Sequence, residues 1–189
     1  MRPVRLVMQA FGPYRQQEVV DFGLLGPNRV FLIHGDTGSG KTTILDAMVF
    51  ALYGDTSGGE RRAEQMRCEA APPDLPTEVV FDFSLGERSY RVRRRPAQEV
   101  QSARGSGMVS KQAEVTLWER TGCTASEEGA PLATKIREAE TQIRDLLGFS
   151  CEQFRQVVVL PQGRFRELLS SGSDKREEIL RQLFRTERF

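Results

Sequence analysis

The chain has 189 residues, of which 39% are hydrophobic and 28% charged, so it can bury a core and is not a disordered protein. Its 27 basic and 26 acidic side chains leave a formal net charge of +1, which excludes a generally basic nucleic-acid coat but allows a local basic face. The three cysteines share no short spacing, so the sequence predicts neither a disulfide framework nor a zinc site.

The first part of the chain predicts strands, a loop and a buried helix. The apolar, partly alternating runs VRLVMQAF, VVDF and RVFLIH indicate short strands, with a GPY turn after the first run. A glycine-rich loop, GDTGSGK, follows at 35–41. The next residues, TTILDAMVFALY, are apolar on nearly every side when wound as a helix, so we expect a buried helix that ends at Gly54.

The middle of the chain predicts a surface segment and then antiparallel strands. Residues 54–77 are polar and rich in Gly, Pro and Arg, as in a surface excursion. The runs TEVVFDFSL, SYRVRRRP and AEVTLWER alternate at period two, which is typical of antiparallel strands. Segment 97–112 has little to bury and predicts a long, mobile hairpin loop.

The last part of the chain predicts two helices around a strand. We expect a helix over 132–147, a strand in VVVLP, a loop at QGRF and a final helix over 174–189. Asp174 and Glu177 have the spacing of a capping box at the start of that final helix.

The loop at 35–42 matches G-x-x-x-x-G-K-[S/T] at every fixed position, between a predicted strand and a predicted helix. Glycines let the backbone wrap a polyphosphate and turn its N–H groups inward, and the helix N-terminus adds partial positive charge. We expect Lys41 to reach the β- and γ-phosphates of ATP and the Thr42 hydroxyl to ligate Mg²⁺. A glycine-rich turn with an incidental lysine is the plainer alternative. The predicted nucleotide-binding residues are Gly35, Asp36, Thr37, Gly38, Ser39, Gly40, Lys41, Thr42 and Thr43.

The groups that hydrolysis also needs, a second acidic Mg²⁺ ligand and a residue that positions water, are not evident. The one Walker-B-like stretch, VVFD, has three apolar residues before Asp82 and no glutamate after it, so a solvated strand position is the better interpretation. The stretch LSSG at 169–172 faintly resembles an LSGGQ signature but predicts a turn between helices. The catalytic apparatus therefore looks incomplete within this chain.

Arginines gather on one predicted strand, where alternation puts Arg91, Arg93 and Arg95 on the same face. Such a row could contact successive phosphates of a nucleic acid. A solvated sheet face with neighbouring acids is the plainer alternative, and the residues alone slightly favour it. His34, which ends the strand before the glycine-rich loop, is interpreted as a packing residue and not as a catalytic base.

Several stretches together resemble the N-terminal half of the SbcC family, the large coiled-coil ATPase subunits of bacterial SbcCD nuclease complexes, related to SMC and ABC ATPases. They are AFGPY at 10–14, GDTGSGKTTILDAMVFALYG at the glycine-rich loop, TSGGERR after it, and VVLPQGRF at 158–165. The resemblance covers essentially the whole chain. The pairing of FGPY with LPQGRF is its specific part.

The resemblance implies an α/β fold, the N-terminal half (lobe I) of a P-loop ABC/SMC-type ATPase head with an antiparallel β portion. Residues 1–172 would carry Walker A and the Q-loop, and 173–189 would begin a helix leading into a coiled coil. Gln162 would be the catalytic Q-loop glutamine that contacts Mg²⁺ and the attacking water. Without the resemblance, LPQG is a plain turn. Walker B, signature and switch residues would lie outside this chain.

The implied function is the ATP-binding half of a DNA-repair ATPase whose ATP-driven head engagement clamps DNA. It would control a partner nuclease acting on double-strand ends and hairpins. The implied partners are the C-terminal half of the same head, a second copy of the head, an SbcD-type metal-dependent nuclease and double-stranded DNA. Because the ATPase site would be composite, we expect the isolated segment to be nearly inactive.

Two other functions stay open at this point. A complete small P-loop metabolite kinase fits the length, although the loop follows three strand-like runs instead of opening the chain. A scaffold that binds nucleotide only to dock DNA or a partner is the second. The N-terminus has no signal-peptide pattern and the apolar run AMVFALY is too short to span a bilayer, so we expect a cytoplasmic, nucleoid-associated protein.

Overall fold

The computed structural model describes residues 1–26, 30–57, 63–102, 107–124, 127–157 and 172. The chain divides into two compact units, Met1–Leu147 and Gly148–Phe189. Gln162, the VVLPQGRF stretch and the predicted helix at 174–189 lie outside the described residues. No helix in the described part of the chain is both long and apolar enough to cross a membrane.

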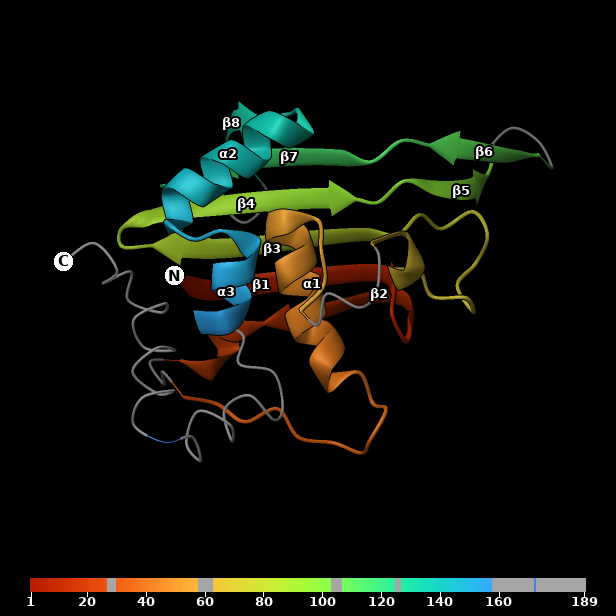
Figure 1. The fold of residues 1–189 in the computed structure, drawn as a ribbon, viewed down its shortest axis with the longest axis horizontal. Helices are drawn as coiled ribbons and strands as arrows, with labels where there is room; N and C mark the ends of the chain where they lie inside the picture. The colour runs from red at the N-terminus through yellow and green to blue at the C-terminus, as the bar shows by residue number, and fades with distance from the viewer. Residues whose placement is uncertain (27–29, 58–62, 103–106, 125–126, 158–171, 173–189) are drawn as a thin grey trace. The chain divides into compact units, whose positions relative to one another are not determined.

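The first unit is built on a six-stranded antiparallel sheet with strand order β2-β1-β3-β4-β7-β8 (Figure 1). Its strands are β1 (Arg2–Phe11), β2 (Tyr14–Asp21), β3 (Glu78–Leu85), β4 (Arg88–Arg95), β7 (Glu114–Glu119) and β8 (Ala130–Ala133). The predicted antiparallel pairing of the three alternating runs is confirmed, because β3 pairs with β4 and β4 with β7. The first two predicted strands are also present, and a short 3₁₀ turn, η1 (Phe22–Leu25), follows β2.

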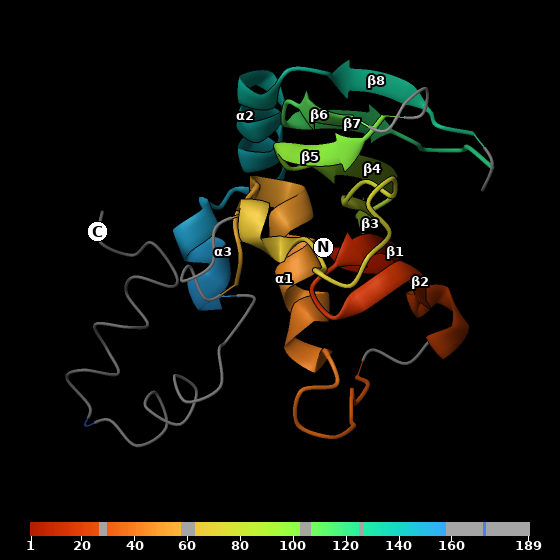
Figure 2. The same ribbon diagram turned by 90° about the vertical axis from the view of Figure 1, so that its right-hand side faces the viewer.

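Two helices, α1 (Lys41–Tyr53) and α2 (Ile136–Leu147), lie over one face of this sheet (Figure 2). The predicted burial of α1 is confirmed, since Ala47, Ala51 and Leu52 are fully buried. The ring of Phe50 lies 5.5 Å from that of Phe11 in β1. Gly54 ends α1 as predicted, in the left-handed conformation (φ 74°) that glycine adopts without strain.

The described part of RVFLIH, residues 30–34, does not form the predicted strand, because residues 30–36 have no regular structure. Val30 and Leu32 are 89% and 83% exposed. An apolar strand of this kind needs a neighbouring strand and two covered faces. Residues 30–34 pair with none of the described strands, although β2 and β8 at the edges of the sheet each have one open side.

The predicted hairpin at 97–112 is confirmed, but its description as a loop with little to bury is wrong. It forms β5 (Gln98–Gln101) and β6 (Met108–Lys111), paired in a separate two-stranded sheet. Val100 is 2% exposed. The Gln98 side-chain amide accepts from the Thr77 N–H at 2.7 Å and donates to the Thr77 carbonyl at 2.9 Å. This two-way bond holds the base of the hairpin.

The predicted surface excursion at 54–77 is packed in part against the β1–β2 turn. A 3₁₀ turn, η2 (Ala63–Met66), follows the undescribed residues 58–62, and Met66 and Cys68 are buried. The Gly12 N–H donates to the Met66 carbonyl at 2.7 Å, and the Cys68 N–H donates to the Ala10 carbonyl at 2.9 Å. Backbone pairing with a distant turn therefore orders this proline-rich stretch.

The second unit contains α3 (Cys151–Val157), which was not predicted. The sequence does carry a pattern that predicts the start of this helix, because Ser150 and Gln153 cap it with two reciprocal hydrogen bonds. The Ser150 N–H donates to the Gln153 Oε1 at 2.9 Å, and the Gln153 N–H donates to the Ser150 hydroxyl at 3.3 Å. This S-x-x-Q spacing is that of a capping box.

The C-terminal end of α1 is capped by a buried arginine. Arg94 of β4 is 5% exposed. Its Nε donates to the Ala51 carbonyl at 3.0 Å and its Nη2 to the Leu52 carbonyl at 3.1 Å. Its Nη1 lies 3.8 Å from a carboxylate oxygen of Glu140 in α2. One guanidinium therefore joins β4 to both helices and places positive charge at the negative end of α1.

We predict that Arg94→Met lowers the free energy of unfolding by about 2–4 kcal/mol, because it keeps the length of the side chain but leaves two buried carbonyls without donors. Urea denaturation measures this effect. Arg137→Met on the exposed side of α2 is the matched control and should change stability by less than about 0.5 kcal/mol. Equal losses in the two variants would contradict the capping role of Arg94.

Candidate nucleotide-binding site

The glycine-rich loop leads directly into α1, with turn and bend residues at 37–40 and the first helical residue at Lys41. Gly38 and Gly40 have φ angles of 86° and 90°, in the range that favours glycine. A Cβ on Gly38 would meet no atom within 4 Å, so the backbone conformation and not crowding calls for glycine there. The motif glycines therefore give the loop a path that other residues would strain.

Lys41 lies across the loop that precedes it. Its Nζ donates to the Gly35 carbonyl at 2.9 Å and to the Asp36 carbonyl at 2.7 Å. The Ser39 N–H donates to the Asp36 carbonyl at 3.1 Å, which closes the turn. The lysine ammonium thus lies beside the loop backbone, where the motif predicts a phosphate.

The start of α1 has the electrostatics of an anion site. The first four N–H groups of a helix have no partner within it and carry partial positive charge. The first turn of α1 contains no acidic residue that would neutralise this charge. Thr42 is exposed, so its hydroxyl can reach a bound ion. Thr43 is buried, so its contribution to a nucleotide would come from its backbone N–H. These residues fit an Mg²⁺-bound polyphosphate.

The segment after α1 is tied back to the helix by Asp46. The Asp46 carboxylate accepts from the Ser57 N–H at 2.9 Å and also from the Ser57 hydroxyl. Ser57 belongs to the TSGGERR stretch, of which residues 58–62 are not described. The visible part of this stretch therefore packs against the helix that carries Lys41.

Asp82 is not the solvated strand residue that we expected. It is 5% exposed and lies opposite Arg91 in the β3–β4 register. Arg91 binds both of its oxygens, through Nε at 2.6 Å and Nη2 at 2.8 Å, and Arg120 Nη1 lies 3.3 Å from Oδ2. The hydrogen bond to Asp82 raises the pKa of the Arg91 guanidinium above its ordinary value. An acid enclosed by two arginines does not fit the role of a Walker B metal ligand.

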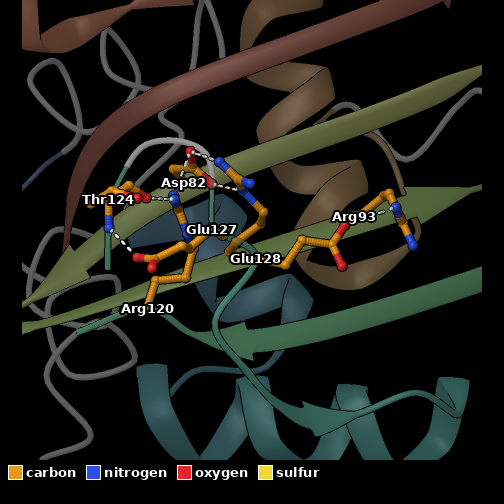
Figure 3. Close-up of polar contacts among 7 residues, drawn as sticks. Asp82, Arg93, Arg120, Thr124, Glu127 and Glu128 are labelled. Atoms are coloured by element: carbon orange, nitrogen blue, oxygen red, sulfur yellow. Dashed lines mark hydrogen bonds and ion pairs between the residues drawn. The ribbon is translucent and has the colours of Figure 1, made fainter. Parts of the chain in front are cut away.

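The loop after β7 also contacts the group formed by Asp82, Arg91 and Arg120 (Figure 3). Arg120 donates through Nη2 to the Thr124 carbonyl at 2.6 Å and through Nε to the Glu127 carbonyl at 3.0 Å. The Thr124 N–H donates to a Glu127 carboxylate oxygen at 2.7 Å. This backbone hydrogen bond lowers the pKa of the exposed Glu127 carboxyl. The loop is therefore held on the sheet by the same arginine that contacts Asp82.

The predicted row Arg91, Arg93 and Arg95 lies on one face of β4, and each arginine has an acidic neighbour. Arg93 lies 5.0 Å from the centre of the Trp118 ring and 3.5 Å from a Glu128 carboxylate oxygen. Arg95 is 2.5 Å from a Glu78 carboxylate oxygen and 3.4 Å from one of Glu114. This arrangement is an acid-paired sheet face, the plainer of the two alternatives for the row, and a DNA contact by these arginines stays a prediction.

Comparison with known proteins identifies a family to which the chain is similar and several similar proteins. A model of the AAA domain family matches residues 5–188. The chain is 46% identical over 187 residues to the SbcC subunit of nuclease SbcCD from Vibrio cholerae. It is 39% identical over 188 residues to the same protein from Lactococcus lactis and 35% over 189 residues to one from Staphylococcus epidermidis. These alignments cover 98–100% of the chain but only 18% of each relative.

We predict that Asp82→Ala lowers the free energy of unfolding by about 2–3 kcal/mol, because it removes the buried carboxylate that the half-buried guanidinium groups of Arg91 and Arg120 contact. Urea denaturation at neutral pH is the measurement. Glu128→Ala serves as the control, since the exposed Glu128–Arg93 pair should contribute less than about 1 kcal/mol. A stable Asp82→Ala protein that had lost only ATP hydrolysis would instead support a metal-ligand role.

Proposed function

The chain belongs to the AAA domain family and aligns along nearly its whole length with SbcC of nuclease SbcCD, and from this we propose that it is the ATP-binding half of a DNA-repair ATPase head. The observation that carries this proposal is the glycine-rich loop at the start of α1, with Lys41 across it. The relatives' name favours this function over a small metabolite kinase.

In this proposal the loop binds ATP with Mg²⁺, which supplies charge neutralisation to the phosphates. Lys41, which contacts the Gly35 and Asp36 carbonyls, would exchange them for the β- and γ-phosphates. The Thr42 hydroxyl would be a ligand of the metal, and the backbone N–H groups of 38–43 would donate to phosphate oxygens. Gln162 orients the attacking water, a role that rests on the resemblance of LPQGRF alone.

The site would be completed by residues outside the described chain. The apolar residues Val30, Phe31 and Leu32 just before the loop are 89%, 44% and 83% exposed, and consecutive exposed apolar residues often mark an interaction surface. We assign the cover for this run to the C-terminal half of the same head, which would also bring Walker B and switch residues. In this arrangement residues 1–172 are the N-terminal half (lobe I) of the head and 173–189 lead into a coiled coil.

A second copy of the head would close over the γ-phosphate, and this closure would clamp double-stranded DNA. Contacts that form only when the γ-phosphate is present would favour the closed state. The relatives' name implies a further subunit, so we assign the nuclease chemistry at DNA ends and hairpins to an SbcD-type partner. This role places the protein in the cytoplasm, associated with the nucleoid.

We predict that Lys41→Ala in the complete protein lowers ATP turnover at least about 100-fold, because Lys41 stabilises charge on the transferred phosphoryl group. Steady-state phosphate release measures this, with Lys111→Ala in β6 as the matched lysine control. The isolated 189-residue segment should show almost no turnover. Steady multiple turnover by the isolated segment, abolished by Lys41→Ala, would contradict the composite site and support a complete enzyme.

We predict that the double variant Arg93→Gln, Arg95→Gln weakens binding of the complete protein to double-stranded DNA. The slope of log affinity against log salt should fall by up to about 2, roughly 0.9 for each phosphate that is no longer neutralised. Fluorescence anisotropy over a salt series measures both quantities. The control is Arg137→Gln, Arg144→Gln on α2. An unchanged slope in the β4 variant would show that this row only pairs with its acids.

A further inference from the structure

The β1–β2 turn, residues 10–14, packs closely against the first turn of α1. Ala10 and Gly12 have φ angles of 48° and 58°, so the turn is tight. A Cβ on Gly12 would lie 2.5 Å from Thr43 Cγ2, which shows how closely the turn approaches the first turn of the helix. Phe11 is fully buried beside Phe50 of α1. The turn therefore has a fixed position relative to the glycine-rich loop.

Tyr14, which ends this turn, contacts the last residue of the loop. Its hydroxyl donates to the Gly40 carbonyl at 3.1 Å. A Cβ on Gly40 would lie 2.7 Å from the Tyr14 hydroxyl oxygen and 2.9 Å from Pro13 Cγ. Tyr14 and Pro13 thus occupy the space that a side chain at position 40 would need. The contact joins a residue of the first strand pair to the N-cap of α1.

The hydrogen bond acts on a peptide group that faces the predicted phosphate site. The Gly40 carbonyl and the Lys41 N–H belong to one planar trans peptide, so they point in opposite directions. When Tyr14 fixes the carbonyl, it also fixes the direction of the Lys41 N–H. That N–H is among the first four of α1, which have no partner within the helix. Hydrogen bonding at the carbonyl also polarises the amide and strengthens its N–H as a donor.

We propose that Tyr14 is a positioning residue for the phosphates, whose hydroxyl holds the Gly40–Lys41 peptide with the Lys41 N–H directed at the bound anion. The proposal rests on the proposed function, since it requires that the loop binds a polyphosphate. Tyr14 itself contacts the loop backbone and acts through it.

The protonation state of Tyr14 is consistent with this role. A phenol must keep its proton to donate to a carbonyl. Burial raises the pKa of the Tyr14 hydroxyl above its ordinary value, and the nearby Glu18 carboxylate raises it further. A raised pKa keeps the neutral, donating form at neutral and mildly alkaline pH.

The test is Tyr14→Phe in the complete protein, with equilibrium binding of MgATP, MgADP and inorganic triphosphate as probes. Loss of the hydrogen bond that orients the Lys41 N–H toward a charged phosphate should weaken the binding of all three probes about 5- to 10-fold. The Michaelis constant for ATP should rise while the turnover number stays nearly constant, as expected when uniform binding is removed. The melting temperature without nucleotide should stay unchanged, which a purely structural role does not predict.

Tyr90→Phe is the matched control, because Tyr90 lies in β4, is 2% exposed and stacks on Phe83. It should leave binding of all three probes unchanged. Unchanged affinities in Tyr14→Phe would overturn the positioning role, as would a loss confined to ATP and ADP, since that would assign Tyr14 to the nucleoside. A fall in affinity matched by a fall in melting temperature would also overturn it.

The same data separate this inference from the proposed function. If the unmodified protein binds none of the probes and Lys41→Ala changes nothing, the proposed function fails and the role of Tyr14 fails with it. If the unmodified protein binds, Lys41→Ala abolishes binding and Tyr14→Phe binds normally, only the positioning role fails.

Discussion

The position of α1 on the sheet is the constraint on which the nucleotide site depends. This helix is apolar on nearly every side, so its own pattern does not select one orientation. Contacts at its two ends fix it instead. The β1–β2 turn fixes the beginning, where Gly12 leaves room for Thr43, and the buried guanidinium of Arg94 fixes the end. The glycine-rich loop therefore runs into a helix whose two ends are both fixed on the sheet.

The sequence predicted the elements whose signal is local. Alternating runs located β3, β4 and β7, and the apolar run after Lys41 located α1. The prediction was wrong for residues 30–34, since an apolar run forms a strand only when it pairs with a partner strand, and these residues pair with no described strand. It also missed α3, although the pair Ser150 and Gln153 carries a readable capping signal.

Side-chain roles that depend on pairing between strands could not be read from one strand. Alternation placed Arg91, Arg93 and Arg95 on one face, but the register that sets Asp82 opposite Arg91 comes from β3. For the same reason, Arg94 drew no attention, because its partners are carbonyls of α1, more than forty residues away. The motif spacing did specify the glycine-rich loop, since its chemistry lies within eight consecutive residues.

The bonds from Lys41 to the Gly35 and Asp36 carbonyls have a thermodynamic consequence for the loop. A phosphate that takes the ammonium exchanges these partners and does not simply add new ones. Part of the enthalpy of the new contacts is therefore spent on breaking internal ones, and the two released carbonyls must turn to water. The affinity of such a loop is smaller than a count of its phosphate contacts suggests, which lets a bound nucleotide leave again.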